Sequence, residues 1–139
     1  MVFILDEGSE FKAPLSKVWE LAQSEGKHNH PSQIDPQTSM QNGVPVLSYG
    51  SRTADGSVVR SSIKVTMLSP VGFVLEYIDG PMEGTKLMQY YTPKGDKTKV
   101  TVVGDAVSKT MKNEDQLRKA VLKGLDTAFK EDQENLRRM

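Results

Sequence analysis

The stretch NEDQLRKAVLKGLDTAFKEDQENLRR, residues 113–138, decides how the rest of the chain must fold. Its apolar positions recur at the spacing of one helix face: Leu117, Val121, Gly124, Leu125, Ala128 and Phe129. Asn113 is a favourable N-cap, and Gln116 follows at the spacing of a capping box. Glu114 and Asp115 suit the positive end of the helix dipole. The sequence therefore predicts a helix from Glu114 to Arg137, about 36 Å long, which can cross a small sheet.

The middle of the chain shows the alternation that is typical of strands. One parity is apolar, at Val59, Ile63, Val65 and Met67, and again at Phe73, Leu75 and Tyr77. Further strands are expected around Leu47 and Tyr49, from Lys86 to Tyr91 and from Lys99 to Val103. Turn sequences separate the strands, among them Asn42-Gly43, Asp55-Gly56 and Gly80-Pro81. Because no helix lies between them, these strands predict an antiparallel meander.

The first part of the chain predicts a strand followed by helical segments. A strand is expected from Phe3 to Lys12, and a helix from about Pro14, because proline is tolerated at a helix start. Its apolar residues lie at helical spacing: Leu15, Val18, Trp19 and Ala22. The polar stretch from Lys27 to Asp35 is interpreted as a second, short and irregular helical segment.

These elements predict an α+β domain that spans residues 1–139. Their order is one strand, two short helices, some six strands and one long helix. The long helix packs most economically into the concave side of a curved antiparallel sheet. A helix of that size does not fill a deep curved sheet, so a cavity is expected between the two, and such cavities hold small molecules.

Composition narrows the function classes. The chain has 139 residues, 18 Lys and Arg against 18 Asp and Glu, and no Cys. The balanced charge argues against a basic nucleic-acid surface, and the lack of Cys excludes disulfides, thiolate metal sites and a Cys nucleophile. The apolar start is too short for a signal peptide or a membrane span, so a cytoplasmic protein without stable membrane insertion is expected. No cofactor is indicated, since phosphate-loop and metalloprotease motifs are missing.

Two local motifs resemble the START-like, helix-grip superfamily, which includes the polyketide cyclases/dehydrases. Residues 10–21, EFKAPLSKVWEL, look like the family's first strand, proline and Val-Trp helix, and residues 27–31, KHNHP, look like its Trp-His-Pro segment with Asn29 in place of Trp. The resemblance covers the whole chain. It implies a seven-stranded antiparallel sheet that grips the last helix around a cavity for an apolar ligand. Lipid carriage, ring cyclisation and chaperone stimulation all occur in the family, so the fold leaves the function open.

Several side chains are candidates for lining that cavity, with an ordinary packed core as the alternative. They are Met40, Leu47, Tyr49, Ile63, Val65, Met67, Phe73, Leu75, Tyr77, Leu87 and Tyr91. Gly124 lies on the apolar helix face, where Gly costs about 1 kcal/mol relative to Ala. It leaves room for a ligand or a close strand, or it packs against a bulky residue such as Tyr49 or Tyr77.

Polar residues on inward-facing positions are the candidates for chemistry. With Phe3, Leu5 and Phe11 pointing inward, Glu7 shares their face, and a buried carboxyl there would have a raised pKa. The alternative is a bulge at Gly8, which would reverse the parity and leave Glu7 in water. Ser61 and Gln89 also share inward faces.

The two histidines, His28 and His30, are weak metal ligands because no third His or Cys accompanies them, and Glu25 or Asp35 would have to complete the site. No metal site is therefore predicted. By the position of the family's segment, His30 is expected at the cavity mouth. A surface or capping histidine is the simpler alternative.

The leading hypothesis is binding of a hydrophobic small molecule, lipid-, isoprenoid- or polyketide-like, between the sheet and the last helix. Tyr49, Tyr77, Tyr91, Glu7 and His30 are the polar groups that could orient it. An enzyme of the cyclase/dehydrase type would use the same cavity, with Glu7 or His30 as acid–base. A protein-interaction module would instead show a collapsed cavity and an exposed apolar patch. The protein is expected to be a monomer or a homodimer.

Overall fold

The structure is a computed structural model that describes residues 1–24 and 29–139. Its elements, in chain order, are β1 (Val2–Phe11), α1 (Leu15–Ala22), β2 (Ile34–Gln41), β3 (Val44–Arg52), β4 (Val58–Leu68), β5 (Gly72–Asp79), β6 (Lys86–Lys94), β7 (Lys97–Ala106) and α2 (Glu114–Arg138). This order confirms the predicted meander between a short helix and a long one.

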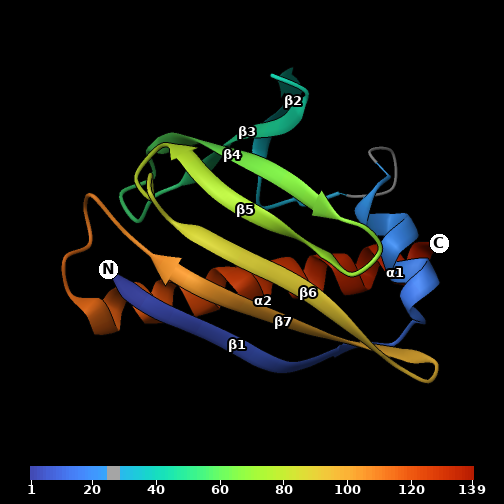
Figure 1. Cartoon of the computed structure of the whole chain (residues 1–139). Coiled ribbons are helices and arrows are strands. Elements are labelled where there is room, and N and C mark those ends of the chain that lie inside the picture. Colours follow the sequence, from blue (N-terminus) through green and yellow to red (C-terminus); the bar gives the residue numbers. More distant parts are fainter. Residues whose placement is uncertain (25–28) are drawn as a thin grey trace.

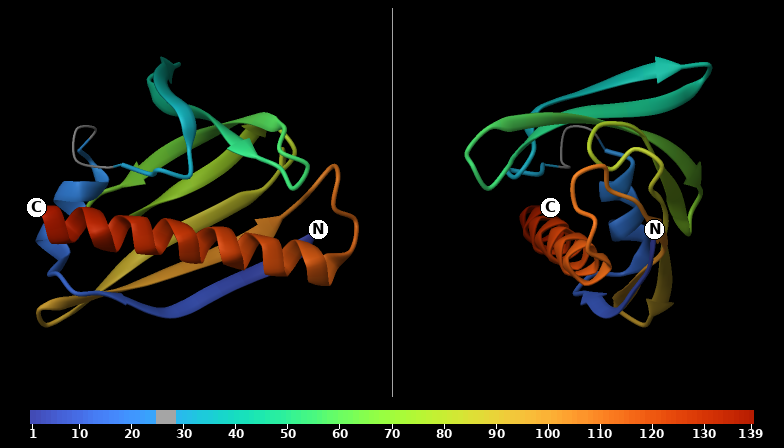
Figure 2. Two further views of the ribbon diagram at one scale, coloured as in Figure 1. Left: turned by 180° about the vertical axis from the view of Figure 1, so that it is seen from behind. Right: turned by 90° about the vertical axis from the view of Figure 1, so that its left-hand side faces the viewer.

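The strands form one seven-stranded antiparallel sheet in the order β1-β7-β6-β5-β4-β3-β2. The first strand therefore pairs with the last, and β1 and β2 are the two edges (Figure 1). The sheet is strongly curved, and α2 runs along its concave side (Figure 2). The predicted α+β architecture, a curved sheet around the C-terminal helix, is confirmed.

Helix α2 has the cap that the sequence predicts. The Asn113 side chain accepts a hydrogen bond from the backbone N–H of Gln116 at 3.0 Å, which satisfies one of the unpaired donors of the first turn. The basic residues of the last turn, Arg137 and Arg138, pair with the Glu134 carboxylate. In the part of the chain that the structure describes, neither α1 nor α2 has the apolar stretch that a membrane crossing requires.

The core lies where β1, β6 and β7 meet the two helices. One cluster surrounds α1 and joins it to the end of α2: Phe11, Ala13, Val18, Trp19, Leu21, Tyr91, Val100 and Leu136. The second lies under the first half of α2: Val2, Ile4, Leu87, Val102, Ala106, Leu117 and Val121. Both clusters hold α2 against the β1–β7 side of the sheet, which fixes where the concave face stays open.

The predicted parity of β1 is wrong at its start. Val2 and Ile4 are buried, whereas Phe3 is 57% exposed and Leu5 49% exposed. The register shifts between Asp6 and Ser9, because the chain bulges at Gly8, where φ is +98°. The bulge returns Phe11 to the buried face, as expected. It also confirms the alternative that leaves Glu7 exposed.

The second helical segment predicted from Lys27 to Asp35 is not found among the described residues. Lys27 lies outside them, Asn29 to Gln33 make a turn closed by the Gln33 N–H on the His30 carbonyl at 2.9 Å, and Ile34 already begins β2. Arg60 donates to the carbonyls of Ile34 and Asp35 at 3.1 and 3.2 Å. The backbone N–H and C=O groups of this segment thus form hydrogen bonds with β3 and with Arg60, in place of the bonds that a helix would have formed within itself.

Candidate functional site

The concave face of β3, β4 and β5 brings together most of the predicted lining residues. The register places them in neighbouring cross-strand rows: Leu47, Ile63 and Tyr77; Val65, Leu75 and Leu87; Met67, Phe73 and Gln89. Tyr49 stands opposite Ser61 on the same face. Cross-strand neighbours of this kind lie within contact distance, so the rows form one continuous surface.

This surface is only partly covered. Helix α2 packs mainly on β1, β7 and α1. Ile63, Leu87 and Tyr91 are buried, but the predicted lining residues nearer the β2 edge keep intermediate exposure: Leu47, Tyr49, Val65, Phe73, Leu75 and Tyr77. Met67 at the end of β4 is 38% exposed. The concave face therefore holds apolar side chains that the protein itself leaves incompletely buried.

Two tyrosine hydroxyls supply polarity to this apolar surface. Tyr49 on β3 and Tyr77 on β5 lie on either side of β4, and each influences the pKa of the other. Burial raises the pKa of both phenols above the usual range of tyrosine, and the neighbouring Tyr49 raises that of Tyr77 further. Both therefore stay protonated at neutral pH, and each can donate or accept a hydrogen bond.

Two pockets that border α2 are small. The larger has a volume of about 30 Å³ and is lined by Asp6, Ser9, Phe11, Gln89, Val100, Val102, Leu125, Ala128, Phe129 and Asp132. The other, of about 10 Å³, lies between Phe11, Val18, Leu21, Ala22, Tyr91, Asp132 and Leu136. Pockets that enclose drug-sized ligands have volumes of roughly 300–1,000 Å³. These two have room for water molecules only.

The larger pocket is nevertheless polar on one side. Gln89 donates from Nε2 to the hydroxyl of Tyr91 at 3.1 Å, and burial raises the pKa of that phenol. Asp6 points into the pocket, and its pKa is raised, mainly by burial and secondarily by the charge of Asp126. The carboxyl on the inner side of β1 is thus Asp6, the neighbour of the predicted Glu7.

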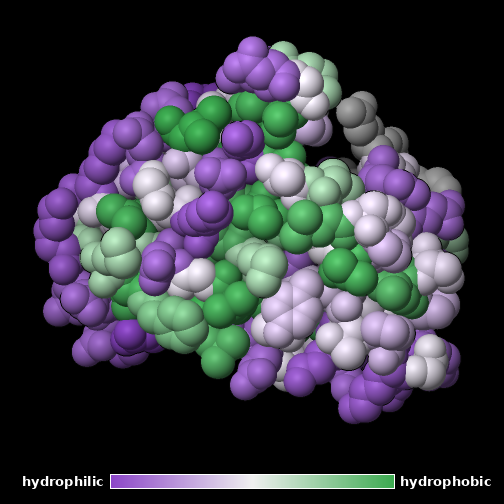
Figure 3. Space-filling model, in the orientation of Figure 1, coloured by the Kyte–Doolittle hydropathy of each residue, from purple (hydrophilic) through white to green (hydrophobic). Residues whose placement is uncertain are grey.

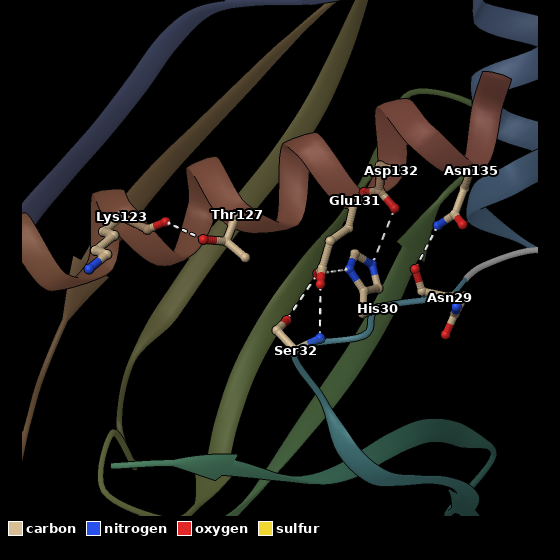
Figure 4. Close-up of polar contacts among 8 residues, drawn as sticks. All are labelled: Asn29, His30, Ser32, Lys123, Thr127, Glu131, Asp132 and Asn135. Atoms are coloured by element: carbon tan, nitrogen blue, oxygen red, sulfur yellow. Dashed lines mark hydrogen bonds and ion pairs between the residues drawn. The ribbon is translucent and has the colours of Figure 1, made fainter. Parts of the chain in front are cut away.

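His30 lies at one end of α2 and joins the turn before β2 to the helix (Figure 4). Its Nδ1 is 2.8 Å from Glu131 Oε1, and its Nε2 is 3.2 Å from Asp132 Oδ1. Glu131 also accepts from the N–H and the hydroxyl of Ser32, at 2.8 and 3.0 Å. Burial lowers the pKa of His30, but the hydrogen bonds and charges of Asp132 and Glu131 outweigh it and raise the pKa overall.

Some predicted site residues lie elsewhere. Glu7 is exposed on the outer side of the bulge, so it does not line the concave face. Met40 is 64% exposed on the edge strand β2, where the register places it on the same face as Leu47. Gly124 is exposed, and a Cβ there would meet nothing within 4 Å, so it does not pack against Tyr49 or Tyr77. His28 and Glu25 lie outside the described residues, within which no group of three or more acidic or histidine side chains could hold a metal ion.

The functional candidates that sequence analysis missed are carboxylates. Asp132 borders both pockets, and Glu131 and Asp132 flank His30. In the helix sequence, Glu131 and Asp132 look like ordinary solvent-exposed charges. The sequence does not show that the turn around His30 folds against them. The glycine at position 8 was the one signal for Asp6. It suggested a bulge, and a bulge after Asp6 turns Asp6 to the inner face in place of Glu7.

No protein-family model matches the chain, and no curated protein matches it. Solved structures do match it over almost its whole length. A START superfamily protein from Mycobacterium smegmatis superposes with a TM-score of 0.79 at 14% identity, covering 98% of this chain and 97% of that one. Ara h 8.0201 gives 0.78 at 14% identity, covering 99% and 98%. The Zhui aromatase/cyclase from Streptomyces sp. R1128 gives 0.65 at 14% identity, covering 96% and 91%. At this identity the likeness defines the fold alone.

Proposed function

We propose that this chain, whose fold is the START-like helix-grip fold, binds a hydrophobic small molecule against the concave face of β3, β4 and β5. One observation carries the proposal: apolar side chains such as Leu47, Val65 and Leu75 line that face and remain partly exposed, because α2 covers the β1–β7 side. The ligand class is lipid-, isoprenoid- or polyketide-like. The proposal keeps the cytoplasmic location expected from the sequence.

Binding would be driven by burial of apolar surface, which contributes about 25 cal/mol per Å² removed from water. The Tyr49 and Tyr77 hydroxyls are the groups best placed to orient a polar end of the ligand, because both side chains lie on this face. Gly124 supports the proposal from the helix side. Helical spacing puts it on the side of α2 that carries Thr127 and Glu131, and a Cβ there would meet no atom within 4 Å.

Native mass spectrometry of the purified protein, followed by extraction and identification of small molecules, tests the proposal. A recurrent stoichiometric apolar compound from more than one expression host is expected. Val65→Lys places a charge on the concave face and should abolish binding. Thr66→Lys is the matched control, because the next residue of β4 points to the opposite face. An apo mass, with no thermal shift from fatty acids, isoprenoids or aromatic polyketides, would contradict the proposal.

A second candidate is an enzyme of the cyclase/dehydrase type, favoured by the polar pocket beside Phe11. Asp6, with its raised pKa, and Tyr91, with Gln89 on its hydroxyl, are candidates for acid–base work there. The likeness to an aromatase/cyclase supports this candidate as well. Turnover of a polyketide substrate that is lost in Asp6→Asn but retained in Glu7→Gln would favour it over simple binding.

The interaction-module alternative is supported by the small volume of the two pockets, about 10 and 30 Å³. It also predicts exposed apolar side chains, and Phe3 and Leu5 on β1 are such residues. The ligand experiment separates this alternative from the leading proposal, since a module of this kind would give an apo mass and no thermal shift.

A further inference from the structure

The convex face of the sheet, which points away from α2, carries an apolar row. The register places its members side by side on four neighbouring strands: Leu5 on β1, Val103 on β7, Met88 on β6 and Val74 on β5. Leu5 is 49% exposed and Met88 38%. Figure 3 shows apolar residues gathered across the middle of the sheet on this side. Val103 and Val74 are half-buried, so the row is a partly exposed apolar strip, and apolar surface of this kind suits an interaction surface.

A row of charges runs beside the apolar row, two residues further along each strand. It consists of Asp105 on β7, Lys86 on β6, Glu76 on β5 and Lys64 on β4, each opposite the next in the register. The signs alternate from strand to strand. Within residues 1–24 and 29–139, no ion pair joins these four side chains to one another.

Read in the opposite direction, this row of charges has the opposite sign at every strand, so two copies of the row can pair with each other. A twofold axis parallel to the strands, between β5 and β6, would turn a second copy so that its row runs in the opposite direction. Lys86 would then face Glu76 of the second copy, and Asp105 would face Lys64 of the second copy. In the apolar row, Met88 would face Val74 of the second copy. A twofold interface pairs the same patch on both subunits, as this arrangement requires.

We infer that the protein self-associates through this convex face as a twofold dimer. The partner is a second copy, because its row already carries the opposite charge at each position. An unrelated protein would need four alternating charges at the same strand spacing. The formal net charge of zero adds no overall repulsion between copies. The concave face stays free in such a dimer, so the inference stands independently of ligand binding.

Charge reversals at the centre of the row test the inference. Glu76→Lys makes two pairs of lysines face each other, and Lys86→Glu makes two pairs of glutamates do so. Each variant alone should raise the dissociation constant of the dimer roughly tenfold or more, since like charges across an interface repel. A 1:1 mixture of the two variants restores opposite charges at every position. The mixture should therefore dimerise as the wild type does, measured by analytical ultracentrifugation at low ionic strength.

Two further variants complete the experiment. The double exchange Glu76→Lys with Lys86→Glu keeps every pair between copies complementary but sets like charges side by side within the sheet. It should dimerise if the row acts between copies. Lys119→Glu, an exposed position on α2, is the matched control for a single charge reversal and should leave the dimer intact. A wild type that stays monomeric, single variants that dimerise normally, or a mixture that remains monomeric would each overturn the inference.

Discussion

The imidazole Nδ1 of His30 lies 2.8 Å from Oε1 of Glu131, across 101 residues of chain. This contact ties the turn before β2 to the last third of α2. Because Glu131 also accepts from the backbone N–H of Ser32, the carboxylate holds two points of the turn at once. With the His30–Asp132 contact and the bond from Asn135 Nδ2 to the Asn29 carbonyl, it holds the turn before β2 against the helix.

The His30 contact should make stability depend on pH. Its pKa is raised in the folded state, so its contribution is fully present below the unfolded value of about 6.5 and is lost as the pH rises through the folded pKa. His30→Gln should lower the free energy of unfolding by about 1 to 3 kcal/mol at pH 5.5 and by less at pH 9. Urea denaturation at both values measures this. Ser32→Ala should give a cost that does not change with pH, and an equal cost of His30→Gln at both pH values would contradict the prediction.

Gly124→Ala should stabilise the protein. The added Cβ meets no atom within 4 Å, so only the gain in helix propensity remains, about 1 kcal/mol. Thermal or urea unfolding measures the gain. Gly72→Ala is the contrasting variant and should be strongly destabilising, because a Cβ there would collide with the backbone of Gln89 and Tyr90. A loss of stability in Gly124→Ala would show that the open space beside α2 is filled in solution.

Asp6 and Glu7 should respond differently to neutralisation. The pKa of Asp6 is raised, chiefly by burial, so its ionised form opposes folding once the pH exceeds the unfolded value of about 3.9. Asp6→Asn should therefore raise the free energy of unfolding at pH 7, by less than about 1 kcal/mol because the group keeps much of its solvent. Near pH 3 the difference should vanish. Glu7→Gln should have little effect, and a larger stabilisation from Glu7→Gln would mean that the bulge at Gly8 is misplaced.

Leu136 should be one of the most sensitive positions of α2. It is 1% exposed and joins the end of the helix to the cluster around Phe11 and Trp19. Leu136→Ala should cost about 2 to 5 kcal/mol, from lost burial and the cavity left behind. Leu68→Ala, at a position that is 39% exposed, should cost much less. Equal effects of the two substitutions on the urea midpoint would argue that the end of α2 is not docked.

The architecture could be predicted because its elements carry strong local patterns. The α2 sequence has both a cap and an apolar stripe, and β4 and β5 alternate cleanly, so their positions were correct. Strand β2 was missed because its residues 34–41, IDPQTSMQ, are polar and contain a proline, as suits an exposed edge strand. Its pairing is determined by β3 and by Arg60, which are contacts that a local pattern does not contain.

The candidate site could be predicted only in part, for a similar reason. Parity identified the inward faces of Leu47, Val65 and Leu75, because a strand alternates regularly until a bulge interrupts it. The bulge at Gly8 places Asp6 on the inner face of β1 in place of the predicted Glu7. The pairing of His30 with Glu131 joins segments 101 residues apart, and no periodicity within either segment indicates it.

The pairing of the first strand with the last has a consequence for synthesis of the protein. Within the domain, β1 is translated before the other strands, whereas β7 and α2, the elements that bury Val2 and Ile4, are its last elements. The growing chain can form the β2–β6 meander early, while β1 waits as an unpaired apolar segment. Completion of the domain is therefore a late step that joins its first strand to its last strand and last helix.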